Sequence, residues 1–235
     1  MDEKLTMYSN IKKVKQKVAI FYVSSVLSGT PYLGFIFAIG AMVAQFMFCY
    51  DLSKLSQSKS LFRNALVVLA CNAFLSLLGI VFTLTFDAES FDTDFERIIF
   101  NLDLSMLIFY IMFALILLLM ATIFLYFVYK KLSFITNQKF LFLGYILSVL
   151  GFGLMTISVF VFLATYIYNN ESIAFLSLFI FIALIGVIIG IVGLILQIIG
   201  WVNFKDLRNS QNGEWIFKYE WFFMDNKKLS ENEKA

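Results

Sequence analysis

The chain has 235 residues, of which 61% are apolar and 29 are phenylalanine, and its formal net charge is only +2. Several uncharged runs of about 20 residues or more match the thickness of a bilayer's hydrocarbon core, whereas a soluble domain of this length would need far more polar surface. This composition excludes a soluble globular protein. It predicts an all-α integral membrane protein, a bundle of about five to six membrane helices.

The first apolar region, residues 18–50, follows a basic N-terminus at residues 1–17 and contains Pro31, the single proline of the chain. As one straight helix this region would be about 48 Å long, which is too long for the hydrocarbon core without steep tilt. Because proline removes a backbone donor and disfavours helix at the preceding residue, we predict that the chain breaks at residues 28–31 and returns as a helical hairpin. The alternative is that residues 18–28 lie flat at the interface and Pro31 starts a single span.

Four further spans are predicted between this hairpin and the C-terminal tail. They lie at about residues 64–86, 105–128, 142–166 and 178–201, and each is long enough to cross a bilayer. Lysine and arginine favour the cytoplasmic side, so we assign the basic connections at residues 51–63 and 129–141 to the cytoplasm and the acidic connection at residues 87–103 to the outside. A single transmembrane domain then covers residues 18–203, with both termini in the cytoplasm.

Residues 204–235 form the predicted cytoplasmic tail, which carries the aromatic segment WIFKYEWFF at residues 215–223. This segment is too short to span a membrane, and Trp and Tyr concentrate at the headgroup layer, so we expect it to rest at the inner interface. Docking of a partner is the alternative. In the acidic connection, apolar side chains recur at helical spacing between residues 91 and 102 and predict an amphipathic surface helix.

Two of the predicted membrane helices share a stripe of small residues. Superposing residues 34–55 on residues 186–207 aligns three small residues and a glutamine at helical spacing. The aligned positions are Gly34, Ala38, Ala41 and Gln45 in the first segment and Gly186, Gly190, Gly193 and Gln197 in the second. Small side chains on one face let helix backbones approach closely within lipid, so both stripes are predicted helix-packing faces. We expect them in equivalent positions, with packing of one stripe on the other as one arrangement.

The basic connections also resemble one another. KLS at residues 54–56 precedes LF at residues 61–62, and KLS at residues 131–133 precedes LF at residues 141–142. We interpret this similarity as a unit of span, connection and span that is repeated in one orientation, about an axis along the membrane normal. Chance similarity in so apolar a sequence is the alternative.

Three stretches carry a resemblance to a known family: TPYLG at residues 30–34, DLSKLSQSKSLFRNAL at residues 51–66 and GLILQIIGWV at residues 193–202. Over about residues 15–204 the chain resembles an uncharacterised family of small prokaryotic multi-pass membrane proteins, domain of unknown function 996. The resemblance implies a location in the prokaryotic plasma (inner) membrane, and it implies no catalytic residue.

The side chains that usually carry chemistry are missing or isolated. The chain has no histidine, and its two cysteines, Cys49 and Cys71, lack the spacing of a metal or redox motif. Within the predicted spans no ionisable group stands at mid-membrane, which argues against a proton relay. We therefore predict no enzyme, no cofactor and no metal site. Capture of a divalent cation by Asp92, Asp94 and Glu96 is the alternative.

The predicted function is that of a non-enzymatic membrane component, a helical bundle that associates with itself or with another membrane protein through its small-residue faces. The alternative is a small permease or channel for an uncharged or small solute. Its polar path would consist of Gln45, Asn72, Thr156 and Gln197. In the first interpretation the same amides connect helices by hydrogen bonds. The expected partners are the lipid bilayer and such a membrane protein, and no nucleic acid is expected.

Overall fold

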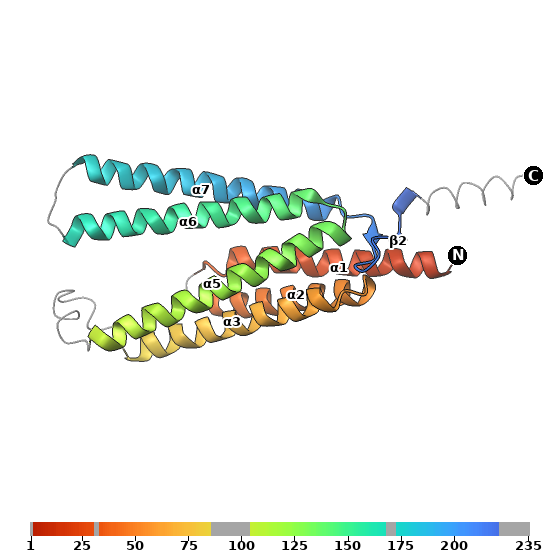
Figure 1. The fold of residues 1–235 in the computed structure, drawn as a ribbon, viewed down its shortest axis with the longest axis horizontal. Coiled ribbons are helices and arrows are strands. Elements are labelled where there is room, and N and C mark those ends of the chain that lie inside the picture. Colours follow the sequence, from red (N-terminus) through yellow and green to blue (C-terminus); the bar gives the residue numbers. More distant parts are fainter. Residues whose placement is uncertain (1, 31–32, 86–103, 168–172, 221–235) are drawn as a thin grey trace, which may run out of the picture.

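The computed structural model describes residues 2–30, 33–85, 104–167 and 173–220, which form an all-α bundle with a short β-hairpin (Figure 1). The elements in chain order are α1 (Asp2–Leu27), α2 (Gly34–Leu55), α3 (Lys59–Thr85), α5 (Leu104–Ile135), α6 (Lys139–Ile167), α7 (Ile173–Val202), β1 (Leu207–Arg208) and β2 (Trp215–Phe217). The prediction of an all-α bundle is confirmed. The surface helix and the candidate cation ligands of the acidic connection lie outside the described residues, as do residues 221–223 of the aromatic segment.

Five helices, α2, α3, α5, α6 and α7, are long and apolar enough to cross a membrane. The outer faces of the bundle are apolar as well, since Phe109, Phe160 and Phe181 are 67%, 61% and 62% exposed. Large apolar side chains on an outer surface are stable in hydrocarbon and costly in water. The chain is therefore a multi-pass membrane protein.

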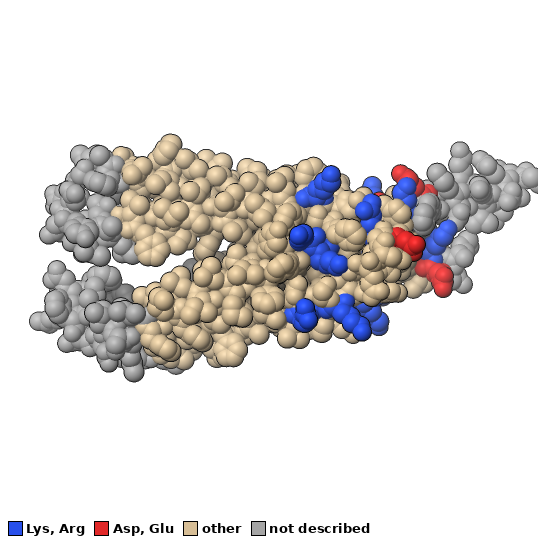
Figure 2. Space-filling view, in the orientation of Figure 1, with Lys and Arg blue, Asp and Glu red and all other residues tan. Residues whose placement is uncertain are grey.

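The helices of the described part pair as three antiparallel hairpins, α1–α2, α3–α5 and α6–α7 (Figure 1). The turns after α2 and α5, the start of α1 and the β-hairpin all lie at the same end of the bundle. Lysine and arginine gather over this end, whereas the opposite half of the visible surface is free of described charged side chains (Figure 2). We call the charged end the basic end.

The first apolar region is a hairpin of two helices, as the proline predicts. α1 ends at Leu27 and α2 begins at Gly34, whose backbone nitrogen donates to Thr30 O at 3.0 Å. A Cβ atom at position 34 would collide with the backbone carbonyl of Ser28, so glycine lets α2 start directly against the end of α1. An ion pair between Lys17 and Asp51 joins the two arms near the basic end.

This hairpin is shorter than its neighbours. α2 has 22 residues and α7 has 30, which correspond to about 33 Å and about 45 Å of helix. The turn between α1 and α2 consequently lies well inside the length of the bundle, whereas α6 and α7 continue beyond it (Figure 1). α1 begins at Asp2, so the basic N-terminus is the first part of the same helix.

The turns after α2 and α5 have the same geometry. Gln57 and Asn137 have φ angles of 56° and 55°, the left-handed conformation that is uncommon for residues other than glycine. Ser58 N donates to Ser53 O at 2.8 Å, and Gln138 N donates to Ser133 O at 3.1 Å. The two turns are thus equivalent in structure, but the register that relates them differs from the predicted alignment of the KLS segments. Ser53 corresponds to Ser133, so the two KLS segments are offset by three residues.

The tail packs into a large apolar core at the basic end. β1 and β2 pair antiparallel with Leu207 opposite Phe217, and both side chains are buried in one cluster with Phe204 and Ile135. The backbone nitrogen of Ser210 donates to Ser56 O at 2.9 Å. The aromatic segment that we expected at the headgroup layer therefore begins as a strand, with one of its phenylalanines inside the protein.

Candidate functional site

A cavity of about 460 Å³ lies among α1, α2, α3, α5 and α6. Its polar or small lining residues are Ser25 of α1, Ser28 just after the end of α1, Ala38, Ala41 and Gln45 of α2, Asn72 and Ser76 of α3, Tyr129 of α5 and Tyr145 of α6. None of the described residues that line it carries a formal charge. The cavity is large enough for a small organic molecule.

The cavity has unused hydrogen-bonding capacity at two side-chain amides. Gln45 follows Ala41 by one helical turn, and Asn72 faces the same space from α3. Neither amide has a hydrogen-bond partner among the residues that the structure describes. Because each amide offers one acceptor and two donors, and an unpaired polar group away from water costs free energy, the pair favours a polar occupant.

The serine hydroxyl groups around the cavity are already engaged with backbone carbonyl oxygens of the preceding turn. Ser25 Oγ donates to Phe21 O at 2.8 Å, Ser28 Oγ donates to Ser25 O at 2.7 Å, and Ser76 Oγ donates to Asn72 O at 3.0 Å. Such bonds to a preceding turn satisfy the hydroxyl donor and leave the oxygen free to accept. New donors for an occupant therefore come from the two amides.

Two stacked tyrosines form the wall at α5 and α6. The rings of Tyr129 and Tyr145 lie 4.9 Å apart between centroids and are inclined by 10°. Tyr145 Oη donates to Thr122 O at 2.6 Å, which fixes one ring. Both side chains are buried, so this wall is flat, aromatic and rigid.

The cavity is closed toward the basic end. Tyr129 belongs to the large apolar cluster together with Phe48, Cys49 and Trp201. Phe48 meets the indole of Trp201 edge-on, with centroids 5.3 Å apart, and Cys49 is fully buried. Close-packed apolar side chains of this kind leave no passage for a polar solute.

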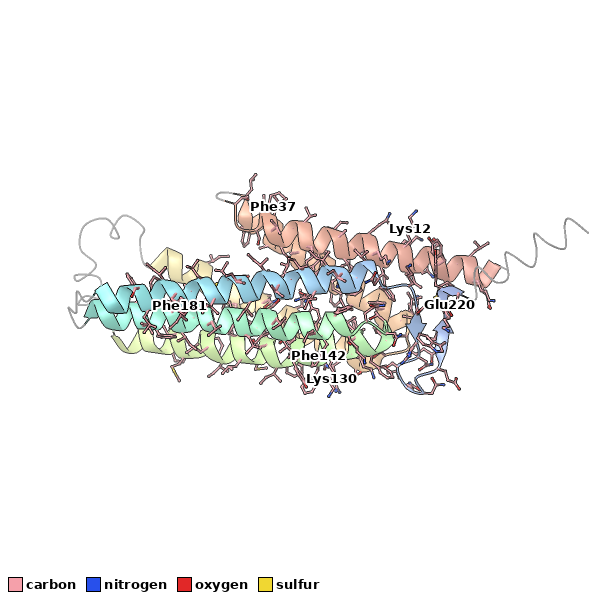
Figure 3. All side chains as sticks on the ribbon, turned by 90° about the horizontal axis from the view of Figure 1, so that it is seen from above. Lys12, Phe37, Lys130, Phe142, Phe181 and Glu220 are labelled. Atoms are coloured by element: carbon pink, nitrogen blue, oxygen red, sulfur yellow. The ribbon has the colours of Figure 1, made fainter. Side chains whose placement is uncertain are left out.

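The opposite half of the bundle is hollow. Figure 2 shows an open slot between α6–α7 and α3–α5 on the side away from the basic end. The α1–α2 hairpin leaves this slot unfilled because it ends early: Phe37, close to the start of α2, lies nearer the basic end than Phe181 of α7 (Figure 3). Ser28, at the tip of the hairpin, lines the cavity. The cavity and the tip of the short hairpin therefore share Ser28.

The structure brings together two of the four predicted path residues. Gln45 and Asn72 line the cavity. Gln197 is only 7% exposed and is held between helices: Tyr22 Oη donates to its Oε1 at 3.0 Å, and its Nε2 donates to Ser148 Oγ at 3.0 Å. It is a contact between helices, as in the first interpretation of the sequence. Thr156 is absent from the cavity wall, and its hydroxyl donates to Phe152 O in its own helix.

The small-residue stripe of α7 packs against α6. A Cβ atom built on Gly193 would lie 2.6 Å from Ser148 N, and one built on Gly186 would lie 2.9 Å from Gly151 O. Distances this short show that the two backbones are in direct contact, which only glycine permits. Gly190 approaches the same helix, since a Cβ on Gly151 would meet its Cα at 2.8 Å.

The corresponding stripe of α2 faces α1 and the cavity. Gly34 contacts the backbone of Ser28, Ala41 is buried, and Ala38 and Gln45 line the cavity. The two stripes therefore do not pack on each other. α2 and α7 instead meet nearer the basic end, through the Phe48–Trp201 ring pair.

The sequence analysis missed the hydroxyl groups that accompany these amides. Tyr22, Tyr129 and Tyr145 were not among the predicted site residues, although each stands within about two helical turns of a lysine that marks the edge of a span. Tyrosine buried in an apolar helix needs a partner for its hydroxyl, so tyrosine at this depth is the signal that could have found them.

Comparison of the chain with protein-family models, with curated proteins and with solved structures found no match. The resemblance to the uncharacterised prokaryotic family stays a prediction.

Proposed function

We propose that the protein is a small permease of the prokaryotic plasma membrane, which binds an uncharged polar solute in the cavity between α1, α2, α3, α5 and α6. The observation that carries this proposal is a pair of amides, Gln45 and Asn72, that have no hydrogen-bond partner among the described residues, in a cavity of about 460 Å³ whose described wall carries no charge. In this proposal the protein is not an enzyme.

The proposed orientation places the basic end and both termini in the cytoplasm, because lysine and arginine favour that side. The slot then opens to the outside, and the cavity is a site that solute reaches from there. The apolar cluster around Phe48 and Trp201 is the inner barrier. Transport requires this barrier to open when the slot closes, as in alternating access.

The chemistry of the wall supports an uncharged solute. Moving an ion into hydrocarbon is costly unless opposite charge or several carbonyl oxygens compensate it, and the described wall offers neither a charge nor a carbonyl ring. Amides pair well with hydroxyl and amide groups, which both donate and accept. Small polyols and urea-like amides are therefore the proposed substrate class.

The first interpretation of the sequence, association with another protein through small-residue faces, has less support. The glycine face of α7 is occupied by α6 of the same chain, and Gly34 of α2 is occupied by α1. These faces are thus not available for a second protein unless the bundle opens.

The test is solute flux into proteoliposomes that contain the full chain, measured by stopped-flow light scattering with glycerol and urea. Glycerol or urea uptake is expected to exceed that of empty liposomes. The double variant Gln45→Leu, Asn72→Leu should lower it on the order of tenfold, because about two hydrogen bonds to the solute are lost. Thr156→Val is the matched control: it also removes a polar group from a span, but it lies away from the cavity and should leave flux unchanged.

A blocking variant separates transport from folding. Ala41→Phe places a ring where the small stripe of α2 borders the cavity, and it should abolish flux in protein that still purifies as a monodisperse species. Flux through the parent no faster than through empty liposomes, or flux that the double variant leaves intact, would overturn the proposal.

A further inference from the structure

Arg208, on β1 of the tail hairpin, is a cation without an ion-pair partner among the described residues. Its guanidinium stacks on the indole of Trp215, with Cζ 4.0 Å from the ring centroid. No hydrogen bond or ion pair joins the guanidinium to any of the described residues, and its Nε is buried. Leaving a buried donor of a charged group unpaired is costly, so such a group usually has a bound partner in the working protein.

A second cation stands beside the same hairpin. Lys131, near the end of α5, donates from Nζ to Ser210 O at 3.1 Å, two residues beyond Arg208. Its ammonium also lies 5.6 Å from the ring centroid of Phe134, on the next turn of α5. The tail hairpin thus carries the guanidinium of Arg208 and binds the ammonium of Lys131 at Ser210, two residues further along the chain.

The nearby carboxylates do not neutralise these cations. Glu214 accepts from Asn212 Nδ2 at 2.7 Å, and Asp206 accepts from the backbone nitrogen of Tyr219 at 2.8 Å. Of the described ion pairs, Lys17–Asp51 and Lys218–Glu220, neither includes Arg208 or Lys131. The pair therefore keeps its positive charge available for an external anion.

The geometry points to a phosphate group as that anion. A guanidinium offers a planar fork of donors that matches two phosphate oxygens, and stacking on Trp215 holds the plane of the fork. An ammonium adds a second charge from another direction. Lys131 lies in the last turns of an apolar helix that is long enough to span the membrane, which places the site at the depth of the lipid headgroups.

We propose that Arg208 and Lys131 form a binding site for a phosphate group, supplied by an anionic phospholipid of the adjoining leaflet or by a soluble phosphate. The site is independent of the solute cavity, because it lies on the tail hairpin at the basic end. Occupation would fix the tail hairpin to α5.

The test compares the two sources of phosphate on the full chain in phosphatidylcholine nanodiscs. In one arm phosphatidylglycerol is added to the bilayer, and in the other inorganic phosphate is added to the buffer. The readouts are the thermal unfolding midpoint and the lipid retained in native mass spectrometry. A rise of the midpoint in the lipid arm alone assigns a lipid headgroup, and a rise in the phosphate arm alone assigns a soluble ligand. A rise in neither arm overturns the proposal.

Site variants separate a specific site from general attraction to a basic surface. Arg208→Gln should weaken phosphate binding by about tenfold or more, since charge-assisted hydrogen bonds are lost. Lys139→Gln removes the same charge from an exposed lysine at the same end and should have little effect. Arg208→Lys keeps the charge but lacks the fork, so binding should be intermediate. Equal weakening by Arg208→Gln and Lys139→Gln would overturn the site. Because Arg208→Gln removes an unpartnered donor, the protein without added phosphate should remain folded.

Discussion

Gln45 and Gln197 stand at matching positions of two aligned sequence segments, yet one lines a cavity and the other is hydrogen-bonded to two neighbouring helices. This difference between the two glutamines arises from the helices that pack against α2 and α7. α6 presents glycine and serine to α7, so the backbones touch and Ser148 comes within reach of Gln197. The comparison teaches that a stripe of small residues closes a helix contact only when the opposing helix also presents small residues to it.

The hairpin of α1 and α2 has no such contact at Gln45. α1 runs beside α2 at this depth, since Ser24 borders Gly40, but no described side chain bonds to the amide of Gln45. The space that the short hairpin leaves open is the slot and the cavity. One half of the molecule is thus a closed helix pair, and the other half keeps a polar space among five helices.

The largest test of this contrast is a pair of glycine substitutions. Gly193→Leu should destabilise the protein by about 3 kcal/mol or more, because its side chain would have to push the backbones of α6 and α7 apart. Gly79→Leu is the control: a Cβ at Gly79 meets nothing within 4 Å, so this variant should unfold close to the parent. Unfolding in detergent, followed by circular dichroism, measures both. Equal stability of the two variants would show that the glycine contact is not what holds α6 to α7.

The next test exchanges the two glutamines. Gln197→Leu leaves Tyr22 and Ser148 without their shared partner and should cost about 1 to 2 kcal/mol. Gln45→Leu removes an amide that has no partner among the described residues, so its effect on stability should stay within about 0.5 kcal/mol of zero. The same unfolding assay applies. A cost for Gln45→Leu as large as that for Gln197→Leu would mean that the cavity amide is a structural contact.

These contrasts show which features of the fold can be predicted from the sequence. The hairpin at Pro31 and the apolar spans follow from local rules of proline geometry and bilayer thickness, and both were predicted. The stripe of Gly186, Gly190 and Gly193 was also found, because helical spacing reveals which residues share a face. The helix that packs on this stripe, α6, was not predicted, because helical spacing shows which residues share a face but not which other helix contacts that face.

The residues of the cavity could also be predicted only in part from the sequence. Gln45 and Asn72 were named as polar path residues, but Thr156 and Gln197 were named with them for the same reason, a polar side chain inside an apolar run. Only the arrangement of helices separates an amide that faces space from one that bonds to a neighbour. The tail hairpin was missed because burial of Phe217 depends on contacts with α5 that are distant in sequence.

The two connecting turns offer a smaller test, in which both halves of the molecule should respond alike. Gln57→Val and Asn137→Val each place a β-branched residue in the left-handed conformation and should each cost about 1 kcal/mol. Asn137→Gly should be neutral or slightly stabilising, because glycine adopts this conformation freely. Gln57→Gly should gain less, because it also removes the hydrogen bond that Gln57 Oε1 accepts from Asn209 Nδ2 at 3.1 Å. Unfolding of the four variants in one detergent checks the prediction. A large difference between the two valine variants would break the equivalence of the turns.

The smallest expected effect concerns the hydrogen bond between α1 of the short hairpin and α7. Lys15 of α1 donates from Nζ to Val202 O of α7 at 2.9 Å, and burial, followed by the nearby Lys205 ammonium, lowers the pKa of Lys15 below its ordinary value. The folded protein then binds fewer protons than the unfolded chain between that lowered pKa and 10.5, so stability should rise with pH across this window. Lys205→Gln removes the repulsion, raises the pKa of Lys15 and flattens the rise.

At neutral pH, Lys205→Gln should stabilise the protein by a few tenths of a kcal/mol, since the two cations are partly exposed and screened. Lys12→Gln, which removes an exposed lysine from the same helix α1, is the matched control and should leave the slope with pH unchanged. Unfolding midpoints at a series of alkaline pH values give the slopes directly. A steeper rise of stability with pH in Lys205→Gln would contradict this prediction. It would mean that Lys205 stabilises the charged form of Lys15 and does not repel it.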